Sequence, residues 1–178
     1  MQFKLSAIAA LASVAAATPV LNARDTTCAA NAVTAINALT EESQNIAKSV
    51  ANLNANTIVI EVPKILQSTV QEVRTMSTGV GLPCEGELTE AEQQQICDAT
   101  GRLISAEEDL VKAFSSRKNL IGSFGLGAPV SAVALDLEGA DQLVFQIADS
   151  TPVCGKSLQD LENTLGKDIQ DLIEQYGL

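Results

Sequence analysis

The sequence predicts an all-α protein, an up-and-down bundle of about five amphipathic helices with two disulfides. Apolar residues recur at steps of three and four over most of the 178 residues, which is the period of an α-helix. Breaks that contain Gly, Pro or Asn separate these stretches, and short connections are typical of antiparallel neighbours. The β-branched run 57–62 has no second such run to pair with, so we expect it to be helical or irregular.

Composition excludes several classes of function. The chain has no His, which removes Ser-His-Asp and Cys-His catalysis, His-ligated zinc and imidazole pH switches. Trp is absent and aromatic residues make up 3%, too few for platforms that stack on sugars or bases. The net charge of −11 and the pI of about 4.3 argue against nucleic acid and anionic membranes as electrostatic partners. With 46% apolar residues, the chain is predicted to form an aliphatic core.

The first 17 residues are typical of a secretory signal peptide. Lys4 supplies a positive start, residues 5–14 form a short apolar stretch, and the alanines that follow offer a small-residue cleavage site. Residues 18–26 are then a short N-terminal extension, and residues 27–178 form the bundle domain. No later stretch of about 18 apolar residues and no hydrophobic lipid-anchor tail is present. We therefore expect a secreted, extracellular protein that does not span a membrane.

The first two helices follow from apolar stripes on either side of an Asn-rich break. Thr26 or Thr27 is the predicted N-cap of the first helix, and its stripe reaches Leu53. The break at residues 52–56 ends this helix. In the second helix, Pro63 falls inside the apolar pattern, so the helix either begins there, with Pro at its first position, or kinks there.

The remaining three helices are marked by their ends. Thr89 and Glu92 have the T-x-x-E spacing of a capping box, which predicts the start of the third helix. A Gly-rich turn over residues 122–128 ends it, and Pro129 suits the first position of the fourth helix. A Ser-Thr-Pro sequence stops the fourth helix, and the fifth begins near Lys156.

Four cysteines in an oxidising compartment predict two disulfides with three possible pairings. Alternating helix directions place Cys28, Cys84 and Cys154 at one end of the bundle, with Cys97 about two turns into the third helix. This geometry favours Cys84–Cys97 and Cys28–Cys154, although the other pairings stay open. A zinc site would need close C-x-x-C pairs, and the spacings contain none.

The opposite end of the predicted bundle carries apolar residues in a Gly-rich turn, where polar residues are usual. Ile121, Phe124, Leu126 and Val130 are candidates for a tip that adsorbs to hydrophobic surfaces. The alternative is that these side chains fold back and plug the end of the bundle. The apolar residues 58–60 are predicted to lie at the same end.

No motif in the chain carries a convincing chemistry. Ser115 and Lys118 match the S-x-x-K pattern of Ser-Lys nucleophiles, but they have no companion motif and a solvated helix face explains them. Residues 136–141 lack the order of a calcium loop, and no Gly-rich segment has the P-loop pattern. We therefore expect no enzyme, no metal and no cofactor.

The Ala-rich leader, the bundle without His or Trp, and the stretch LPCEGELTEAEQQQICDAT at residues 82–100 resemble the fungal hydrophobic surface-binding protein A and cell wall mannoprotein family. The resemblance spans residues 25–178. It implies an all-α domain that binds fatty acids or other lipids between its helices, or that adsorbs to hydrophobic solids. It also implies recruitment of secreted hydrolases to such surfaces, and at most a loose association with the cell wall.

An aliphatic bundle with few large aromatic side chains has room for an acyl chain in its centre. The candidate lining residues are Ile65, Leu66, Val73, Leu103, Leu110, Phe114, Leu137, Val144, Leu165 and Ile169. Gln71 and Arg74 are candidate partners of a lipid head group. The competing function is that of a structural or interaction protein of the fungal cell wall, such as an antigen or effector.

Overall fold

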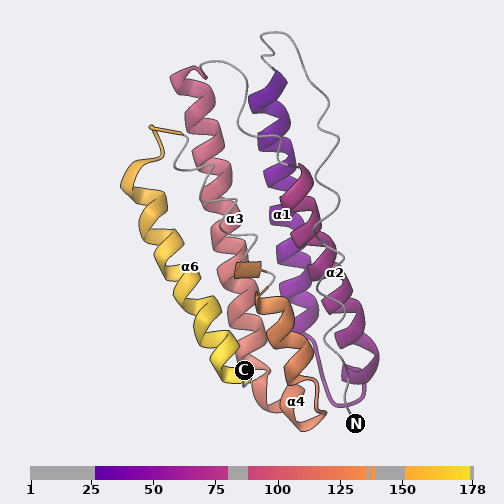
Figure 1. Cartoon of the computed structure of the whole chain (residues 1–178). Coiled ribbons are helices and arrows are strands. Elements are labelled where there is room, and N and C mark those ends of the chain that lie inside the picture. The colour runs from indigo at the N-terminus through magenta and orange to yellow at the C-terminus, as the bar shows by residue number, and fades with distance from the viewer. Residues whose placement is uncertain (1–26, 80–87, 136, 139–150, 177–178) are drawn as a thin grey trace, which may run out of the picture.

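The computed structural model describes residues 27–79, 88–135, 137–138 and 151–176 (Figure 1). The helices are α1 (Thr27–Ala51), α2 (Ile58–Gly79), α3 (Glu90–Ser116), α4 (Lys118–Ser123) and α6 (Gly155–Tyr176), with a further helical segment at residues 127–135. The described residues form no strand, so the predicted all-α class is confirmed. The predicted signal peptide and extension lie outside them. Among the helices described, none has an apolar stretch that could cross a bilayer.

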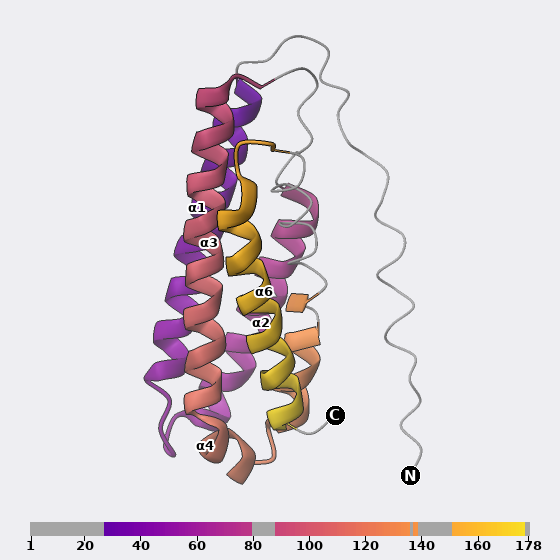
Figure 2. The ribbon, with the colours of Figure 1, turned by 90° about the vertical axis from the view of Figure 1, so that its left-hand side faces the viewer.

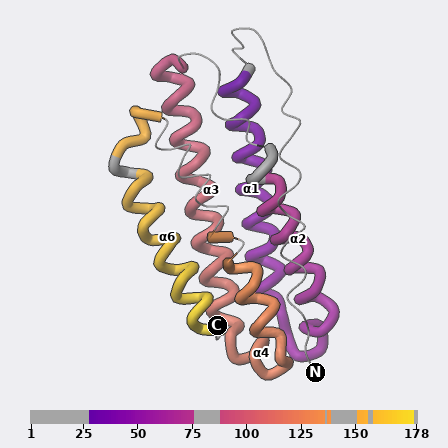
Figure 3. The backbone as a smooth tube through the Cα atoms, in the orientation of Figure 1, coloured from indigo at the N-terminus to yellow at the C-terminus, as the bar shows by residue number. Residues whose placement is uncertain are grey.

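The chain reverses direction from one helix to the next when the helical segment 127–135 is included, as predicted for an up-and-down bundle (Figure 3). Figure 3 follows the chain down α1, up α2, down α3, around α4, up the segment 127–135 and down α6. Helices α1, α3 and α6 therefore end where α2 begins. We call this end, formed by residues 48–64, 115–130 and 173–176, the α4 end.

Helices α1 and α3 are parallel neighbours and have the most extensive contact in the bundle. Arg102 Nη2 donates a hydrogen bond to Asn37 Oδ1 at 3.0 Å, and Arg117 Nη2 donates one to the carbonyl oxygen of Ala51. The two bonds join residues 65 and 66 positions apart, so the register between the helices stays constant along their length.

The four long helices form a curved layer in the order α2, α1, α3, α6 (Figures 1 and 2). The segment 127–135 rises between α2 and α6 and covers the inner side of this layer, so we call it the cover segment. Its residues Val130, Val133 and Ala134 are buried in one cluster with side chains from all four layer helices. The core of the protein thus lies between the cover segment and the layer.

The start of α3 is the predicted capping box. The Thr89 hydroxyl accepts a hydrogen bond from the Glu92 backbone N–H at 3.3 Å, and the Thr89 N–H donates to Glu92 Oε2 at 2.8 Å. The sequence predicts that the second helix either begins at Pro63 or kinks there, and the structure selects the longer helix, which begins at Ile58 and contains Pro63. Ile58 and Val62 are fully buried, and the β-branched run that contains them is helical because these two side chains pack in the core. This packing outweighs both the low helix propensity of the β-branched residues and the hydrogen bond that Pro63 cannot donate.

The turn after α4 is a Schellman motif. The N–H of Leu126 donates to the Ile121 carbonyl at 3.2 Å, and the N–H of Gly125 donates to the Gly122 carbonyl at 3.0 Å. Gly125 has φ of 70°, a left-handed conformation that a residue without Cβ adopts at no steric cost. The motif directs Ile121 and Leu126 into the bundle and leaves Phe124, 41% exposed, outside it.

The structure corrects the predicted disulfides, since Cys97 is bonded to Cys154 with a Cα–Cα distance of 5.2 Å. Both predicted pairs, Cys84–Cys97 and Cys28–Cys154, are therefore wrong. Cys28 is also disulfide-bonded, and Cys84 lies outside the described residues. The physical reason is packing order, because α6 lies directly against α3 and begins about two turns below its start, at the height of Cys97.

Candidate functional site

The predicted lining residues meet in the core rather than around an open tunnel. Six of them share the main cluster of buried side chains: Ile65, Leu110, Phe114, Leu137, Leu165 and Ile169. Leu66 and Val73 are partly buried and pack against this cluster. These residues come from α2, α3, the chain just after the cover segment, and α6. They form one aliphatic interior between the cover segment and the layer.

Two predicted lining residues do not belong to this cluster. Leu103 is fully buried in a second, smaller cluster with Ile36 and Leu39 of α1 and with Ile96. Val144 lies outside the described residues. Val73 packs against both clusters and so links them.

Polar side chains are also buried in this interior. The hydroxyls of Thr40, Thr69 and Thr100 donate to the carbonyl four residues earlier in their own helices, at 2.9 to 3.0 Å. Such bonds satisfy the hydroxyl within its helix. These three threonines therefore leave no donor for a ligand.

Ser43 and Glu72 form a buried contact between α1 and α2. Ser43 Oγ donates to Glu72 Oε1, and both side chains are fully buried. Glu107 of α3 is buried as well. The register between α1 and α3 places Glu107 beside residues 41–42, within one turn of Ser43. Two carboxyl groups therefore lie at similar heights in the core, and among the described residues they are its only buried side chains of the Asp, Glu, Lys or Arg type.

Ser131 on the cover segment is the feature of the core that sequence reasoning missed. Its side chain is fully buried, and Oγ has no hydrogen-bond partner among the described residues. Its neighbours Val130, Val133 and Ala134 are apolar and belong to the main cluster. A buried hydroxyl without a partner costs about 1–3 kcal/mol, which makes the Ser131 hydroxyl a candidate donor for a ligand in the core.

The predicted head-group residues lie on the solvent-facing side of α2. Gln71 and Arg74 are exposed, whereas Thr69 and Glu72 point inward. The helical period explains this outcome, because the positions between two core-facing residues turn toward solvent. A Glu at position 72, at core spacing from Ile65 and Thr69, was the available signal for a buried polar group on α2.

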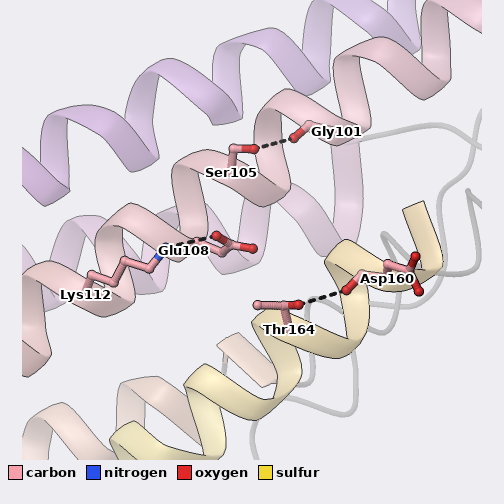
Figure 4. A network of polar contacts seen from close by, with 6 residues as sticks. All are labelled: Gly101, Ser105, Glu108, Lys112, Asp160 and Thr164. Atoms are coloured by element: carbon pink, nitrogen blue, oxygen red, sulfur yellow. Dashed lines mark hydrogen bonds and ion pairs between the residues drawn. The ribbon is translucent and has the colours of Figure 1, made fainter. Parts of the chain in front are cut away.

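Two open grooves lie on the surface of the bundle. The larger, of about 600 Å³, runs between α3 and α6 and is bordered by Gln94, Arg102, Asp109, Leu161 and the Cys97–Cys154 disulfide. Figure 4 shows that the polar contacts along this side stay within their own helices. These contacts are Ser105 to the Gly101 carbonyl, Lys112 to Glu108, and Thr164 to the Asp160 carbonyl.

The smaller groove, of about 430 Å³, lies between α1 and α2. Glu41, Glu42, Glu61 and Lys64 border it, and so does Ile65. Ile65 is thus the one predicted lining residue that borders either of these two grooves. Charged and amide side chains border both grooves, whereas the core is aliphatic, so we take the core as the candidate site for an acyl chain.

The predicted adsorbing tip is divided between the inside and the outside of the α4 end. Ile121 and Val130 are buried, so neither can contact an adsorbing surface. Leu126 is half-buried. Phe124 is exposed, and so are Val59 and Ile60 of α2, at 61% and 63%. Part of the predicted tip is thus buried in the end of the bundle, and Phe124 stays exposed together with Val59 and Ile60.

Tyr176 closes the core at the α4 end. Its hydroxyl donates to the Phe114 carbonyl at 2.9 Å, and its ring lies 3.3 Å from where a Cβ on Gly127 would be. Burial raises the pKa of Tyr176 to about 12. The contact ties the last turn of α6 to the end of α3 and to the first residue of the cover segment.

The S-x-x-K pattern and possible metal ligands were the other candidates for a site. Ser115 belongs to α3 and Lys118 to α4, so the break between these helices separates the two residues of the S-x-x-K pattern. No three Cys, Asp or Glu side chains within the described ranges are grouped to hold a metal ion.

Known proteins share the fold of this chain, but none of the matches assigns it to a family. No family model and no curated protein sequence matches the chain. Two solved structures from Penicillium marneffei are similar to it. Ligand-binding domain 1 of the MP1 protein, complexed with arachidonic acids, has a TM-score of 0.56 and 16% identity over 83% of this chain and 99% of that domain. Domain 2, complexed with multiple arachidonic acids, has a TM-score of 0.52 and 14% identity over 88% and 99%. At these identities the likeness establishes a shared fold.

Proposed function

We propose that this protein is a secreted, non-enzymatic lipid-binding protein that holds a fatty acid in the core between the cover segment and the helical layer. The likeness in fold to two domains that bind arachidonic acids supports this function. The aliphatic composition of the core supports it independently. The single observation that carries the proposal is the buried hydroxyl of Ser131, which has no described partner.

The acyl tail supplies the affinity in this proposal. Burial of one CH₂ contributes about 0.8 kcal/mol, so a chain of about 16 carbons contributes roughly 12 kcal/mol before costs. Association and ordering cost about 4–15 kcal/mol, a range that includes the whole contribution of the tail. A hydrogen bond between a hydroxyl and a charged carboxylate contributes about 1.5–3 kcal/mol. The head group therefore fixes the orientation of the ligand and also adds a smaller share of its affinity.

The choice between the two buried serines follows from which hydroxyl is already bonded. Ser43 donates to Glu72, so its proton is engaged within the bundle. Ser131 is buried on a segment whose other buried residues are apolar, and its hydroxyl has no described partner. We therefore assign the head group to Ser131, with the tail between the cover segment and the layer.

Native mass spectrometry of the protein with a long-chain fatty acid tests this proposal. Ser131→Ala is expected to weaken binding about ten- to hundredfold. It is also expected to leave the free energy of unfolding of the lipid-free protein unchanged or higher, because it removes an unsatisfied hydroxyl and favours the helix. Ser105→Ala, which removes an exposed α3 hydroxyl bonded to its own helix, is the matched control. Absence of any bound fatty acid would refute the function, and equal binding by both variants would refute the assignment of Ser131.

A second role, adsorption to hydrophobic surfaces, is favoured by Val59, Ile60 and Phe124, which are exposed at one end of the bundle. We propose that this end adsorbs while the core remains packed. Recruitment of a secreted hydrolase to such a surface would follow from adsorption and belongs to the same proposal. Secretion itself is tested by the mass of protein from the culture medium, which is expected to begin at Thr18.

A further inference from the structure

The α4 end combines exposed apolar side chains from two separate segments. Val59 and Ile60 project from the first turn of α2, and Phe124 projects from the turn after α4. Figures 1 and 2 place the start of α2 and α4 at the same end of the bundle in both views. These three are among the most exposed large apolar side chains in the described part of the chain.

Local structure fixes these side chains outside the core. Ile58 and Val62 occupy the inward positions of the first turns of α2, which leaves Val59 and Ile60 outward. The Schellman motif of α4 does the same for Phe124 by turning Ile121 inward. The apolar end is therefore a consequence of ordered helix ends rather than of a loose loop.

The charges at this end are opposite in sign to the charge of the whole chain. The described residues of the α4 end carry four cations and two carboxylates: Lys48, Lys64, Arg117, Lys118, Glu61 and Glu174. Glu61 is paired with Lys64 at 3.0 Å. The whole chain carries a net charge of −11. The acidic residues are thus concentrated elsewhere in the bundle.

Screening by salt determines whether a charged surface at the α4 end interacts with the net charge of the whole protein or only with the nearby charges. Helix α3 has 27 residues, so the bundle is about 40 Å long. The Debye length at 0.1 M salt is about 10 Å. A charged surface at the α4 end therefore interacts with the nearby cations, while carboxylates at the far end, such as Glu90 and Asp160, are largely screened. The net charge of −11 therefore does not prevent this end from binding an anionic membrane.

We propose that the α4 end docks the protein on an anionic phospholipid bilayer. Val59, Ile60 and Phe124 enter the boundary between head groups and acyl chains, and Lys48 and Lys118 contact the lipid phosphates and carboxylates. The benefit of docking rests on the proposed lipid-binding function, because a protein on the bilayer would have its core close to a source of acyl chains. It is tested independently of ligand uptake.

Flotation with vesicles tests the proposal. Vesicles of phosphatidylcholine with phosphatidylserine are expected to bind the full-length secreted protein more tightly than vesicles of phosphatidylcholine alone, and added salt is expected to reduce this difference. Lys118→Gln is expected to weaken binding to the anionic vesicles about fivefold. Lys156→Gln removes the same charge from the start of α6, at the opposite end, and is expected to change nothing. Ile60→Ser with Phe124→Ser is expected to weaken binding to both kinds of vesicle.

Equal binding to the two kinds of vesicle, or equal effects of Lys118→Gln and Lys156→Gln, would overturn the proposal and reduce the α4 end to an apolar adsorbing surface. Fatty-acid binding measured on the same variants keeps the two proposals apart. Uptake without vesicle binding refutes docking alone. Vesicle binding without uptake refutes the fatty-acid function alone.

Discussion

Ser43 of α1 donates a hydrogen bond to Glu72 of α2 across the interior of the bundle, and neither side chain is exposed to solvent. This contact joins two antiparallel helices through a buried carboxylate. A buried polar group that loses its partner is destabilising, because its desolvation is no longer compensated. The pair therefore belongs to the stability of the bundle as well as to the polarity of its core.

Ser43→Ala is expected to lower the free energy of unfolding by about 1–3 kcal/mol, as measured by urea denaturation. Ser49→Ala is the matched control on the same helix. Both hydroxyls lie close to the carbonyl oxygen four residues earlier, at 3.0 and 2.9 Å, but Ser49 is exposed. The control is expected to stay within about 0.5 kcal/mol of the parent protein. Equal losses for the two variants would show that the contact with Glu72 contributes nothing.

The Cys97–Cys154 disulfide closes a loop over a sequence separation of 57. Loop-closure entropy assigns about 4 kcal/mol to a loop of this length. Replacement of both cysteines by Ala is therefore expected to lower the guanidinium midpoint without changing the helical content of the native protein. Peptide mapping under non-reducing conditions is expected to recover residues 97 and 154 in one cross-linked fragment. A fragment that joins residues 84 and 97 would contradict the fold described above.

Phe124→Asp is expected to weaken adsorption to hydrophobic beads about tenfold, since burial of an exposed aromatic side chain contributes about 1.5–3 kcal/mol. Leu135→Asp is the matched control, because Leu135 is 46% exposed, close to the 41% of Phe124, but lies on the cover segment beyond the α4 end. Urea denaturation is expected to show unchanged stability for both. Equal adsorption of the two variants would show that the α4 end is not the adsorbing surface.

Tyr176 predicts a loss of stability in strong alkali. Its pKa is raised to about 12 by burial, whereas an exposed tyrosine ionises near pH 10. The folded state thus keeps the proton that the unfolded state loses, so stability is fully present below pH 10 and falls as the pH rises toward 12. Tyr176→Phe is expected to lose less stability over this interval, measured as the denaturation midpoint at pH 9 and pH 11. An identical pH dependence in the two proteins would rule out this role for Tyr176.

Sequence patterns predicted the parts of the fold that depend on local chemistry. The capping box of Thr89 and Glu92 and the start of α6 near Lys156 are confirmed, because backbone groups at helix ends need nearby partners. For α2 the sequence left two alternatives open, a start at Pro63 or a helix that continues through it. Tertiary burial of Ile58 and Val62 decides between them, and no local rule contains that information.

The candidate site was predicted only in part, for a related reason. Periodicity identified core residues such as Leu110 and Leu165, since one face of each helix must be buried. It does not tell which helices are neighbours, which is why the Cys97–Cys154 bond was missed. It also does not mark Ser131, because a serine on an apolar helix face satisfies its hydroxyl or leaves it unpaired according to what packs against it.

A crystal structure of the complex with a long-chain fatty acid tests the central claim most directly. The measured quantity is the distance from Ser131 Oγ to the nearest carboxyl oxygen of the ligand. We expect this distance between Ser131 Oγ and the carboxyl oxygen to be about 2.5–2.7 Å, with the tail enclosed between the cover segment and the four layer helices. A ligand lying in the groove between α3 and α6, with Ser131 Oγ still without contact, would contradict it.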